Sequence, residues 1–411
     1  MAEQMKPSGI DWIGDIPKSW KVTRLQTLFD QVKDKNSGTK EKNLLSLSYG
    51  KIVKKDIEGA FGLIPESFDT YNIIKKNDIV LRLTDMQNDQ VSLRTGLVKE
   101  EKGIITSAYV TIRLKCGSPS YYHWYLYAFD TSKQIYAFGQ GVRQSLTFEE
   151  LKKMLILLPS PKEQQAIADF LDEECAQIDS IAADLEKQIV LLQQYKKSLI
   201  TETVTKGLDK SAPMKDSGVE WIGKIPEHWQ KTRIKFEASI IGSGTTPDSG
   251  NSMYYDNGEH SWIQSGDLYG KDYIYETEKQ LTNLAILECH ALNWYTKDFV
   301  VVAMYGASVG NVAISKIDSF TNQACCVIKL NEKNDNRYLF YFLKAAQEEM
   351  LLKAFGGTQP NISQIIIKNL NFLNVPLLEQ IEIADFLDSK CDMINEMLKS
   401  KKDQYDILIK H

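Results

Sequence analysis

The sequence predicts an α+β fold in which two similar mixed α/β domains are joined by two long antiparallel coiled-coil helices, with a pseudo-two-fold internal repeat. The first observation behind this prediction is that residues 5–24 return as residues 214–233, with 12 of 20 positions identical. The second is that EQQAIADFLD at residues 163–172 returns as EQIEIADFLD at residues 379–388, with 8 of 10 identical. A duplicated unit is expected to fold twice on one frame.

Each unit begins with a mixed segment and ends in a long helix. We expect the first domain at residues 1–157 with its entry motif at 5–24, a central helix at 158–208, the second domain at 209–374 with its entry motif at 214–233, and a C-terminal helix at 375–411. Short β-branched runs predict strands at 78–83, 108–114, 299–303 and 325–330. Residues 121–128 and 338–346 are predicted as short helices. Between these landmarks the segments differ, which is typical of one frame carrying different surface loops.

The two long helices are predicted from apolar residues that recur in heptads. Pro161 suits the start of the central helix and Gly207 its end. The C-terminal helix leaves a domain attached to the end of the central helix, so it buries its stripe by running back antiparallel. Aligned on the repeat, His411 answers Tyr195, and the second copy lacks a counterpart of residues 196–207. The seam residues are Leu171, Ile178, Leu185 and Leu192 on the first helix and Ile383, Leu387, Ile394 and Leu408 on the second.

Composition and charge limit the classes of function. A chain of 411 residues, 43% hydrophobic and 25% charged, fits two or three globular domains. It has no run of roughly 18 apolar residues, so no membrane span is expected. The six cysteines form no CxxC pair, which favours a reducing cytoplasm over a disulfide framework. The net charge is −5, although residues 1–157 carry 23 basic against 18 acidic side chains, so attraction to DNA phosphates is expected to be modest.

Motifs for catalysis are missing from the sequence. It contains no glycine-rich phosphate loop of the GxxxxGK[ST] type and no HExxH zinc motif. It also lacks the Asp/Asn-Pro-Pro-Tyr/Phe tetrapeptide with which an amino-methyltransferase would hold its target amine. We therefore expect no catalytic residue and no metal site in this chain.

The doubled SGxxWxGxIPxxW motif and the doubled EQxxIADFLD helix start, separated by two dissimilar segments, resemble the specificity subunit of type I restriction-modification enzymes. The resemblance covers nearly the whole chain. It implies that the variable segments are target recognition domains, each reading one half of a bipartite double-stranded DNA sequence. It further implies that the helices set the spacing and dock two modification (methyltransferase) subunits, with restriction subunits joining where present. S-adenosylmethionine, ATP and Mg would be bound by those partners and not by this chain.

Candidate DNA-binding residues lie in loops rich in glycine and in hydrogen-bonding side chains. Amides and arginines are suited to base edges, whereas Lys51 and Lys54 suit phosphates. For each loop a simple turn is an equal alternative, and the family resemblance favours binding for the set. In the first domain the candidates are Ser46, Ser48, Tyr49, Lys51, Lys54, Arg82, Thr84, Gln87, Asn88, Arg143 and Gln144. In the second they are Ser243, Thr245, Thr246, Ser265, Asp267, Tyr305, Ser308, Thr358, Gln359 and Asn361.

The tryptophans of the entry motifs are expected to anchor each entry segment where a domain meets a helix, facing the core or a partner subunit. Together with helix-seam residues they form the predicted subunit interface. This set comprises Trp12, Trp20, Leu171, Ile178, Leu185, Leu192, Trp221, Trp229, Ile383, Leu387 and Ile394. Two other functions stay open: a standalone DNA nuclease or methyltransferase, and a scaffold that binds only proteins.

Overall fold

The computed structural model describes residues 4–55, 67–86, 89, 93–138, 145–355 and 361–410. The chain forms two compact units, Met1–Ile181 and Ala182–His411, and helix α4 (Pro161–Lys206) belongs to both. None of the helices within these ranges is long and apolar enough to cross a membrane.

The first unit combines short strands with a few helices. Its elements are β1 (Met5–Pro7), β2 (Asp15–Pro17), β3 (Lys21–Arg24), α1 (Leu25–Leu28), β4 (Phe29–Gln31), β5 (Leu45–Ser48), β6 (Lys51–Lys54), β7 (Asn72–Lys75), β8 (Ile79–Leu81), β9 (Thr95–Leu97), β10 (Lys102–Ile105), β11 (Val110–Leu114), α2 (Pro119–Thr131), η1 (Gln134–Phe138), α3 (Phe148–Leu151), β12 (Leu155–Leu158) and the start of α4.

The second unit repeats this plan with additional elements. They are β13 (Met214–Asp216), β14 (Lys224–Pro226), β15 (Gln230–Arg233), α5 (Ile234–Glu237), β16 (Ala238–Ser243), η2 (Ser252–Tyr254), β17 (His260–Ile263), η3 (Ser265–Leu268), β18 (Tyr273–Ile274), β19 (Gln280–Leu281), α6 (Asn283–Glu288), β20 (Phe299–Ala303), β21 (Val312–Ser315), β22 (Phe320–Thr321), β23 (Cys325–Leu330), α7 (Asn336–Ala345), α8 (Gln347–Leu352), α9 (Gln364–Lys368), β24 (Asn371–Asn374) and α10 (Leu377–Lys410).

One central sheet organises each domain, and the strands have the same order in both. The first sheet is ordered β4-β11-β8-β9, and the second β16-β23-β20-β21-β18. All neighbouring pairs in them are antiparallel except β18 with β21. Helices α2 and α7 pack on equivalent faces, next to β9 and β21. The strands and short helices predicted from the sequence landmarks are thus confirmed.

The second sheet is apolar on both faces because both are covered. Val300, Val302 and Ile328 join α7 in one core cluster, whereas Val301 and Val327 join Ile263, Leu268 and Tyr295 in another. All five residues of β20 are buried. A strand buried on both faces reads as a continuous apolar run instead of an alternating one, which is the pattern seen in the sequence.

The repeated entry motif docks onto the repeated helix start in the same way in both copies. The Trp20 indole Nε1 donates to Glu163 Oε1 at 2.9 Å, and Trp229 Nε1 donates to Glu379 Oε2 at 2.9 Å. Trp12 packs against Tyr125 at 5.7 Å between ring centroids, and its counterpart Trp221 against Phe342 at 5.4 Å. The prediction that these tryptophans anchor the entry segments is confirmed.

The glutamine of the repeated helix start fastens α2 and α7. Gln164 Oε1 accepts the backbone N–H of Ser118 at 3.0 Å, just before α2, and Gln380 Oε1 accepts that of Asp335 at 2.9 Å, just before α7. Both glutamines are buried, so these bonds satisfy backbone groups that water does not reach. The glutamine is therefore shared by the two EQxxIADFLD segments because it holds the start of α2 or α7 in each copy.

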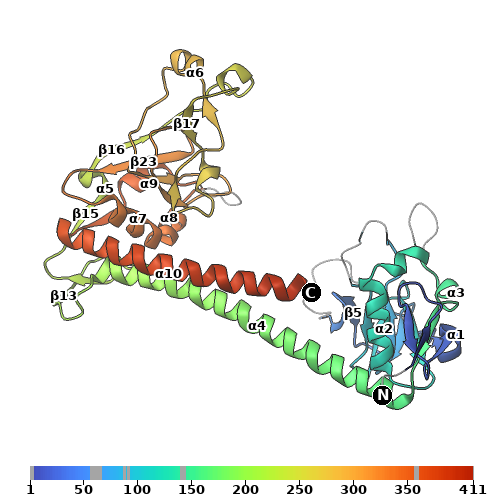
Figure 1. Ribbon diagram of the computed structural model, residues 1–411. Helices are drawn as coiled ribbons and strands as arrows, with labels where there is room; N and C mark the ends of the chain where they lie inside the picture. Colours follow the sequence, from blue (N-terminus) through green and yellow to red (C-terminus); the bar gives the residue numbers. More distant parts are fainter. Residues whose placement is uncertain are drawn as a thin grey trace. The chain divides into compact units, whose positions relative to one another are not determined.

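Helices α4 and α10 run antiparallel, as predicted. Tyr405 donates to Glu186, and Lys196 donates to Asn395 Oδ1 at 2.8 Å, so residue numbers rise along one helix as they fall along the other. Figure 1 shows α10 lying along the C-terminal part of α4. Gly207 ends α4 with a positive φ of 74° and packs against the Trp229 ring.

The predicted seam is correct in its C-terminal part and wrong in its N-terminal part. Leu185 and Ile394 are buried, and Leu192 and Leu408 are half-buried. Ile383 and Leu387 are buried as well, in a core cluster shared with Ile200 and Val204 of α4. Ile178, however, is 42% exposed and Leu171 is half-buried within the first unit. The part of α4 that packs with α10 begins near Leu185, so the heptad pattern by itself extended the predicted seam too far towards the N-terminus of α4.

Candidate nucleic-acid interface

The candidate loops of the second domain gather at one edge of its sheet. Ser243 at the end of β16 pairs with Cys326, and Ala303 at the end of β20 pairs with Cys325, at the start of β23. The loops after β16, after β20 and before β23 therefore emerge together. The loop after β17 joins them because Ile263 pairs with Thr321 and the Asn322 N–H donates to the Ile263 carbonyl at 3.0 Å.

Close backbone approach makes this edge compact. A Cβ at Gly244 would lie 1.7 Å from the Thr321 carbonyl oxygen, so only glycine fits there. Ile362 N–H donates to the Met304 carbonyl at 2.7 Å, which brings the chain next to Asn361 to the same edge. Asn361 is exposed. The strand registers therefore bring to one edge of the sheet the polar loops that the sequence indicated one by one.

The individual candidates of the second domain differ in what their side chains offer. Thr246 donates to Gln323 Oε1 at 2.5 Å, and Ser243, Thr245, Ser265 and Tyr305 are half-buried. Burial raises the pKa of the Tyr305 phenol, so its hydroxyl stays protonated as a hydrogen-bond donor at neutral pH. Ser308 is buried.

Asp267 has a structural role within η3. It is buried, its Oδ2 accepts the Gln264 N–H at 2.8 Å, and its Oδ1 accepts the Glu278 N–H at 3.1 Å. A carboxylate whose oxygens already accept backbone N–H groups has less to offer a base edge. DNA contact by Asp267 stays a prediction.

Gln323 is a candidate that sequence reasoning missed. Its side chain is exposed at the centre of the loop edge, next to Thr246 and Tyr305. An exposed amide of this kind offers a donor and an acceptor, the pair that recognises adenine. The signal in the sequence is the Thr321-Asn-Gln stretch, which places two amides directly before β23.

In the first domain the equivalent edge is formed where β8 ends and β9 and β11 begin. Leu81 pairs with both Thr95 and Val110. The β5–β6 hairpin reaches this edge, because Leu93 lies within 3.1 Å of where a Gly50 Cβ would be. Its turn residues Tyr49 and Gly50 have φ of 46° and 74°, the type I′ geometry that suits a two-residue hairpin.

The hairpin presents a side chain to solvent at its tip. Tyr49 is 82% exposed, Lys54 is exposed, and Ser46 and Ser48 are half-buried in β5. Lys51 is exposed but forms an ion pair with Asp179 of α4 at 2.6 Å. A phosphate contact by Lys51 would have to compete with that pair, whereas Lys54 is free of any ion pair among the described residues.

A buried arginine that no sequence pattern indicated shapes the loop that follows β8. The Arg94 guanidinium donates to the carbonyls of Arg82 at 3.2 Å and Thr84 at 2.9 Å, and also to those of Asp85 and Asp89. Its side chain is fully buried. Five donors in a rigid fork are suited to holding several carbonyls at once. Arg94 therefore fixes the backbone from which Arg82 and Thr84 project.

Arg82 itself is paired. Its Nη1 lies 3.2 Å from Asp89 Oδ2, and its side chain is 30% exposed. Thr84 is exposed. The candidates Gln87, Asn88, Arg143, Gln144, Thr358 and Gln359 lie outside the described residues.

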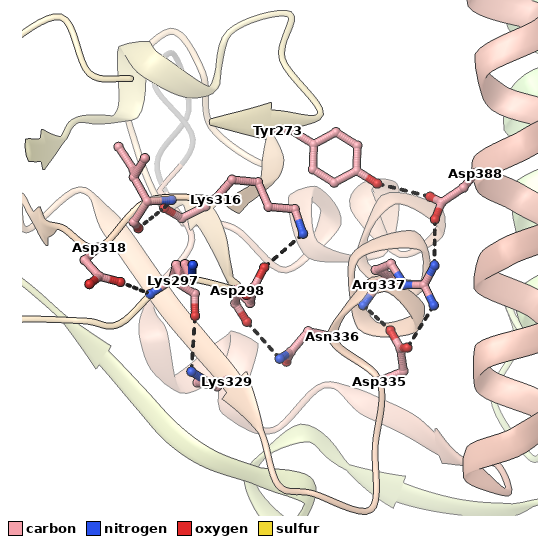
Figure 2. A network of polar contacts seen from close by, with 12 residues as sticks. Tyr273, Lys297, Asp298, Lys316, Asp318, Lys329, Asp335, Asn336, Arg337 and Asp388 are labelled. Carbon is pink, nitrogen blue, oxygen red and sulfur yellow. Dashed lines mark hydrogen bonds and ion pairs between the residues drawn. The ribbon is translucent and has the colours of Figure 1, made fainter. Parts of the chain in front are cut away.

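Helices α2 and α7 are each tied to a long helix through an aspartate of the repeated helix start. In the first domain Asp172 accepts Ser120 Oγ at 2.7 Å and Trp124 Nε1 at 2.8 Å. In the second, Asp388 accepts Arg337 Nη1 at 2.9 Å, Tyr341 OH at 2.7 Å and Tyr273 OH at 3.1 Å. Figure 2 shows Arg337 between Asp335 and Asp388, with the Tyr273 hydroxyl pointing to the other carboxylate oxygen of Asp388.

With this geometry, comparison with known proteins identifies the family. The model of the type I restriction modification DNA specificity domain matches residues 17–190 and again residues 226–404. The chain belongs to this family. Its two matches fall on the two copies of the repeat, as expected for a specificity subunit with two target recognition domains.

Relatives and solved structures agree with this assignment. The protein of Methanocaldococcus jannaschii that carries the name of the MjaX specificity subunit is 25% identical over 414 residues, covering 96% of this chain and 92% of its own length. The MjaVIII specificity subunit of the same organism is 24% identical, covering 95% and 90%. A structure concerning complex assembly and conformational transition of the type I R-M system aligns with a TM-score of 0.70 at 14% identity over 96% of both chains. The HsdS subunit of Thermoanaerobacter tengcongensis aligns with a TM-score of 0.53 at 14% identity, covering 95% and 92%. At such identity the structures support the fold of the specificity subunit.

The residues predicted for a subunit interface are placed differently in this specificity subunit. Trp229, Leu185, Ile383, Leu387 and Ile394 are buried within the chain. Their role is to hold the domain and helices together, and they present little surface to a partner. Trp12, Trp20 and Trp221 are half-buried, as are Leu171 and Leu192, and Ile178 is exposed. Contact of these residues with a partner stays a prediction.

Proposed function

We propose that this specificity subunit reads a bipartite double-stranded DNA target, with one half-site recognised by each sheet edge described above. The observation that carries the proposal is that one frame, matched twice by the family, presents two different sets of polar loops at the same edge. A shared frame explains why two domains bind the same kind of partner, and different loops explain why they read different bases.

The chain acts without catalytic residues of its own under this proposal. Helices α4 and α10 set the spacing of the two half-sites and dock two modification subunits, which methylate the DNA, with restriction subunits joining where present. S-adenosylmethionine, ATP and Mg belong to those partners, and the complex works in the cytoplasm. Among the described residues no group of three or more histidines, cysteines and carboxylates is arranged to hold a metal. The absence of catalytic motifs from the sequence is in keeping with this division of labour.

Gln323 provides the sharpest test of base reading. In the assembled complex with its modification subunits, Gln323→Ala should leave one base position of one half-site less well discriminated, by about fivefold or more, because an amide pair with adenine contributes about 1–3 kcal/mol of discrimination. The measurement is competition binding with DNA duplexes changed at single base pairs, together with methylation mapping in cells.

The matched control is Gln230→Ala, which removes an exposed amide from β15, away from the loop edge. It should leave discrimination unchanged at every position. Equal loss of affinity for all sequences in the Gln323 variant, or altered discrimination in both half-sites, would contradict independent reading by the two domains. Methylation by the purified chain alone would instead support the standalone enzyme, and a complex that protects no specific sequence would support a protein-only scaffold.

A further inference from the structure

A cleft of about 710 Å³ lies between the helix pair and the body of the second domain, and none of the DNA-reading candidates lines it. Its walls come from α4, α10, the segment from Leu268 to Tyr275, the start of β21 and the region where α7 leads into α8. Clefts of about 300–1,000 Å³ are typical of small-ligand sites. All of the lining residues belong to the second unit.

Two lysines share one carboxylate in this cleft. Lys344 Nζ contacts Asp272 Oδ1, and Lys196 Nζ lies 3.6 Å from Asp272 Oδ2 while donating to Asn395 Oδ1 at 2.8 Å. The side chains of Lys196, Lys344 and Asp272 are only 17%, 24% and 31% exposed. Two ammonium groups against one carboxylate leave a net positive charge in a poorly solvated place, which is costly unless an anion compensates it.

The titration of these groups agrees with a shortage of negative charge. Burial lowers the pKa of the Lys344 ammonium, and its contacts with Asp272 do not fully offset this effect because Lys196 is also near. Burial alone would raise the pKa of Asp272, but the two lysines outweigh it and hold that pKa below its ordinary value. Asp272 is therefore ionised at neutral pH, and it does not supply enough charge for both lysines.

The other lining residues suit a ligand larger than a simple ion. Lys271 adds positive charge, whereas Lys197 is paired with Glu348, and the exposed Asp392 is the other carboxylate that lines the cleft. Tyr275 is 69% exposed and offers an aromatic face on which a base could stack. The amides of Gln193, Asn311, Gln347 and Asn395 offer donors and acceptors.

We propose that this cleft binds a phosphate ester of nucleotide size, with Lys196 and Lys344 on the phosphate and Tyr275 beside the base. The phosphate belongs either to a free nucleotide or to a DNA backbone, and the chemistry of recognition is the same. Because the walls come from both long helices and from the domain body, the ligand would fasten the second domain to its helices. This inference goes beyond DNA reading and does not depend on it.

The test is calorimetric titration of the full chain with adenosine 5′-monophosphate, with inorganic phosphate and with a short duplex that lacks any target sequence. Lys196→Gln should weaken binding by about tenfold, which corresponds to the loss of one charge-assisted hydrogen bond. Asp272→Asn should keep or strengthen binding, since it removes the competing carboxylate. The control Lys187→Gln changes an exposed lysine of α4 that does not line the cleft, and should have no effect.

In a binding site, the Lys196 variant binds the ligand more weakly and the Asp272 variant does not. In a cluster with only a structural role, both substitutions would do damage. Thermal melts of each variant establish that it is folded. Binding of the nucleotide, with competition by phosphate, identifies a free nucleotide as the ligand. Binding of the duplex alone, weakened by Lys196→Gln, identifies the DNA backbone. The proposal is overturned if no phosphate ligand binds more tightly than about 1 mM, or if Lys196→Gln and Lys187→Gln behave alike.

Discussion

The two domains hold their long helices by the same aspartate with different partners. Asp172 in the first domain accepts neutral donors from Ser120 and Trp124 of α2. Asp388 in the second accepts Arg337 and Tyr341 of α7, at the positions that correspond to Ser120 and Trp124. The repeated fold therefore places an aspartate at the same position in both copies, and each copy provides different hydrogen-bond donors to it. The second copy adds an ion-pair network, because Arg337 also pairs with Asp335 and Asp385.

A second difference between the two domains lies at the residue before Trp124 on α2. His123 of α2 corresponds to Phe340 of α7, which is buried among aromatic residues. The His123 Nδ1 atom is buried and has no hydrogen-bond partner among the described residues. Burial lowers the pKa of His123 to about 4, in spite of Asp172 nearby. The first domain thus contains a titratable group where the second has a hydrocarbon ring.

The largest expected effect concerns the paired tryptophans. Trp229 is fully buried and Trp20 is only half-buried, although both donate to an equivalent glutamate. Trp229→Ala should therefore destabilise the second domain by about 4 kcal/mol, and Trp20→Ala the first by about 2 kcal/mol. Hydrogen exchange measured separately in each domain gives the readout, since a chain with two compact units need not unfold in one step.

Conservative variants of the same residues separate packing from hydrogen bonding. Trp20→Phe and Trp229→Phe keep most of the ring and should each cost about 1 kcal/mol for the lost bond to glutamate. Equal losses for the two alanine variants would show that burial does not distinguish the two entry segments.

The charged network should matter more than the neutral one. Arg337→Met removes the partner of three carboxylates, of which Asp335 and Asp388 are 15% and 25% exposed, and should cost about 3 kcal/mol. Trp124→Phe removes one hydrogen bond to Asp172 and should cost about 1 kcal/mol. Hydrogen exchange of the backbone amides in α7 and in α2, measured at increasing denaturant concentration, compares the two losses of stability.

Salt provides an independent check on this pair. Raising the sodium chloride concentration should reduce the difference in free energy of unfolding between wild type and Arg337→Met, because the ion pairs are partly exposed to screening. It should leave the effect of Trp124→Phe unchanged. A difference that is insensitive to salt would mean that Arg337 acts by packing and not by charge.

The difference between the domains at His123 predicts acid sensitivity of the first domain. Since the pKa of His123 is lowered on folding, its stabilising contribution is present above the unfolded pKa of about 6.5 and is lost as pH falls towards 4. Between pH 7 and pH 5 the first domain should lose about 2 kcal/mol from this residue. Exchange protection in α2, corrected for the intrinsic rate, measures the loss.

His123→Phe copies the residue of the second domain and should remove this part of the acid response. Protection in α7 of the same molecules serves as the internal reference, because Phe340 does not titrate. If the variant and the wild type lose protection in α2 equally between pH 7 and pH 5, another group is responsible.

Much of the fold was accessible from the sequence because of the repeat. Two copies of one motif indicated two domains, and the strands around Val80 and Val301 were recognisable as β-branched runs bounded by turns. The antiparallel direction of the helices followed from connectivity alone. The helix start EQxxIADFLD was recognised as a marker, but the tasks of its glutamate, glutamine and aspartate became clear only from the contacts.

The candidate interface was predicted less completely, for physical reasons that differ between residues. Loops such as the one at Ser265 could be proposed from glycine and hydroxyl content, and strand register then brought them to one edge. Whether a polar side chain is free is a different question. Asp267 accepts the backbone N–H groups of Gln264 and Glu278, and Arg82 pairs with Asp89 of the same loop. These contacts depend on the conformation of each loop, which residue types alone do not specify.

The sequence by itself determined the duplicated architecture, the identity of the frame residues and the membership of the family, because these depend on local pattern and repetition. Only the tertiary structure decided that Arg94 is buried beneath a loop, that Gln323 is exposed at the centre of the recognition edge, and that Lys196 and Lys344 share Asp272. Each of these facts depends on segments distant in sequence that meet in space. A charge or an amide acquires its role from its solvation and its neighbours, which the fold alone brings together.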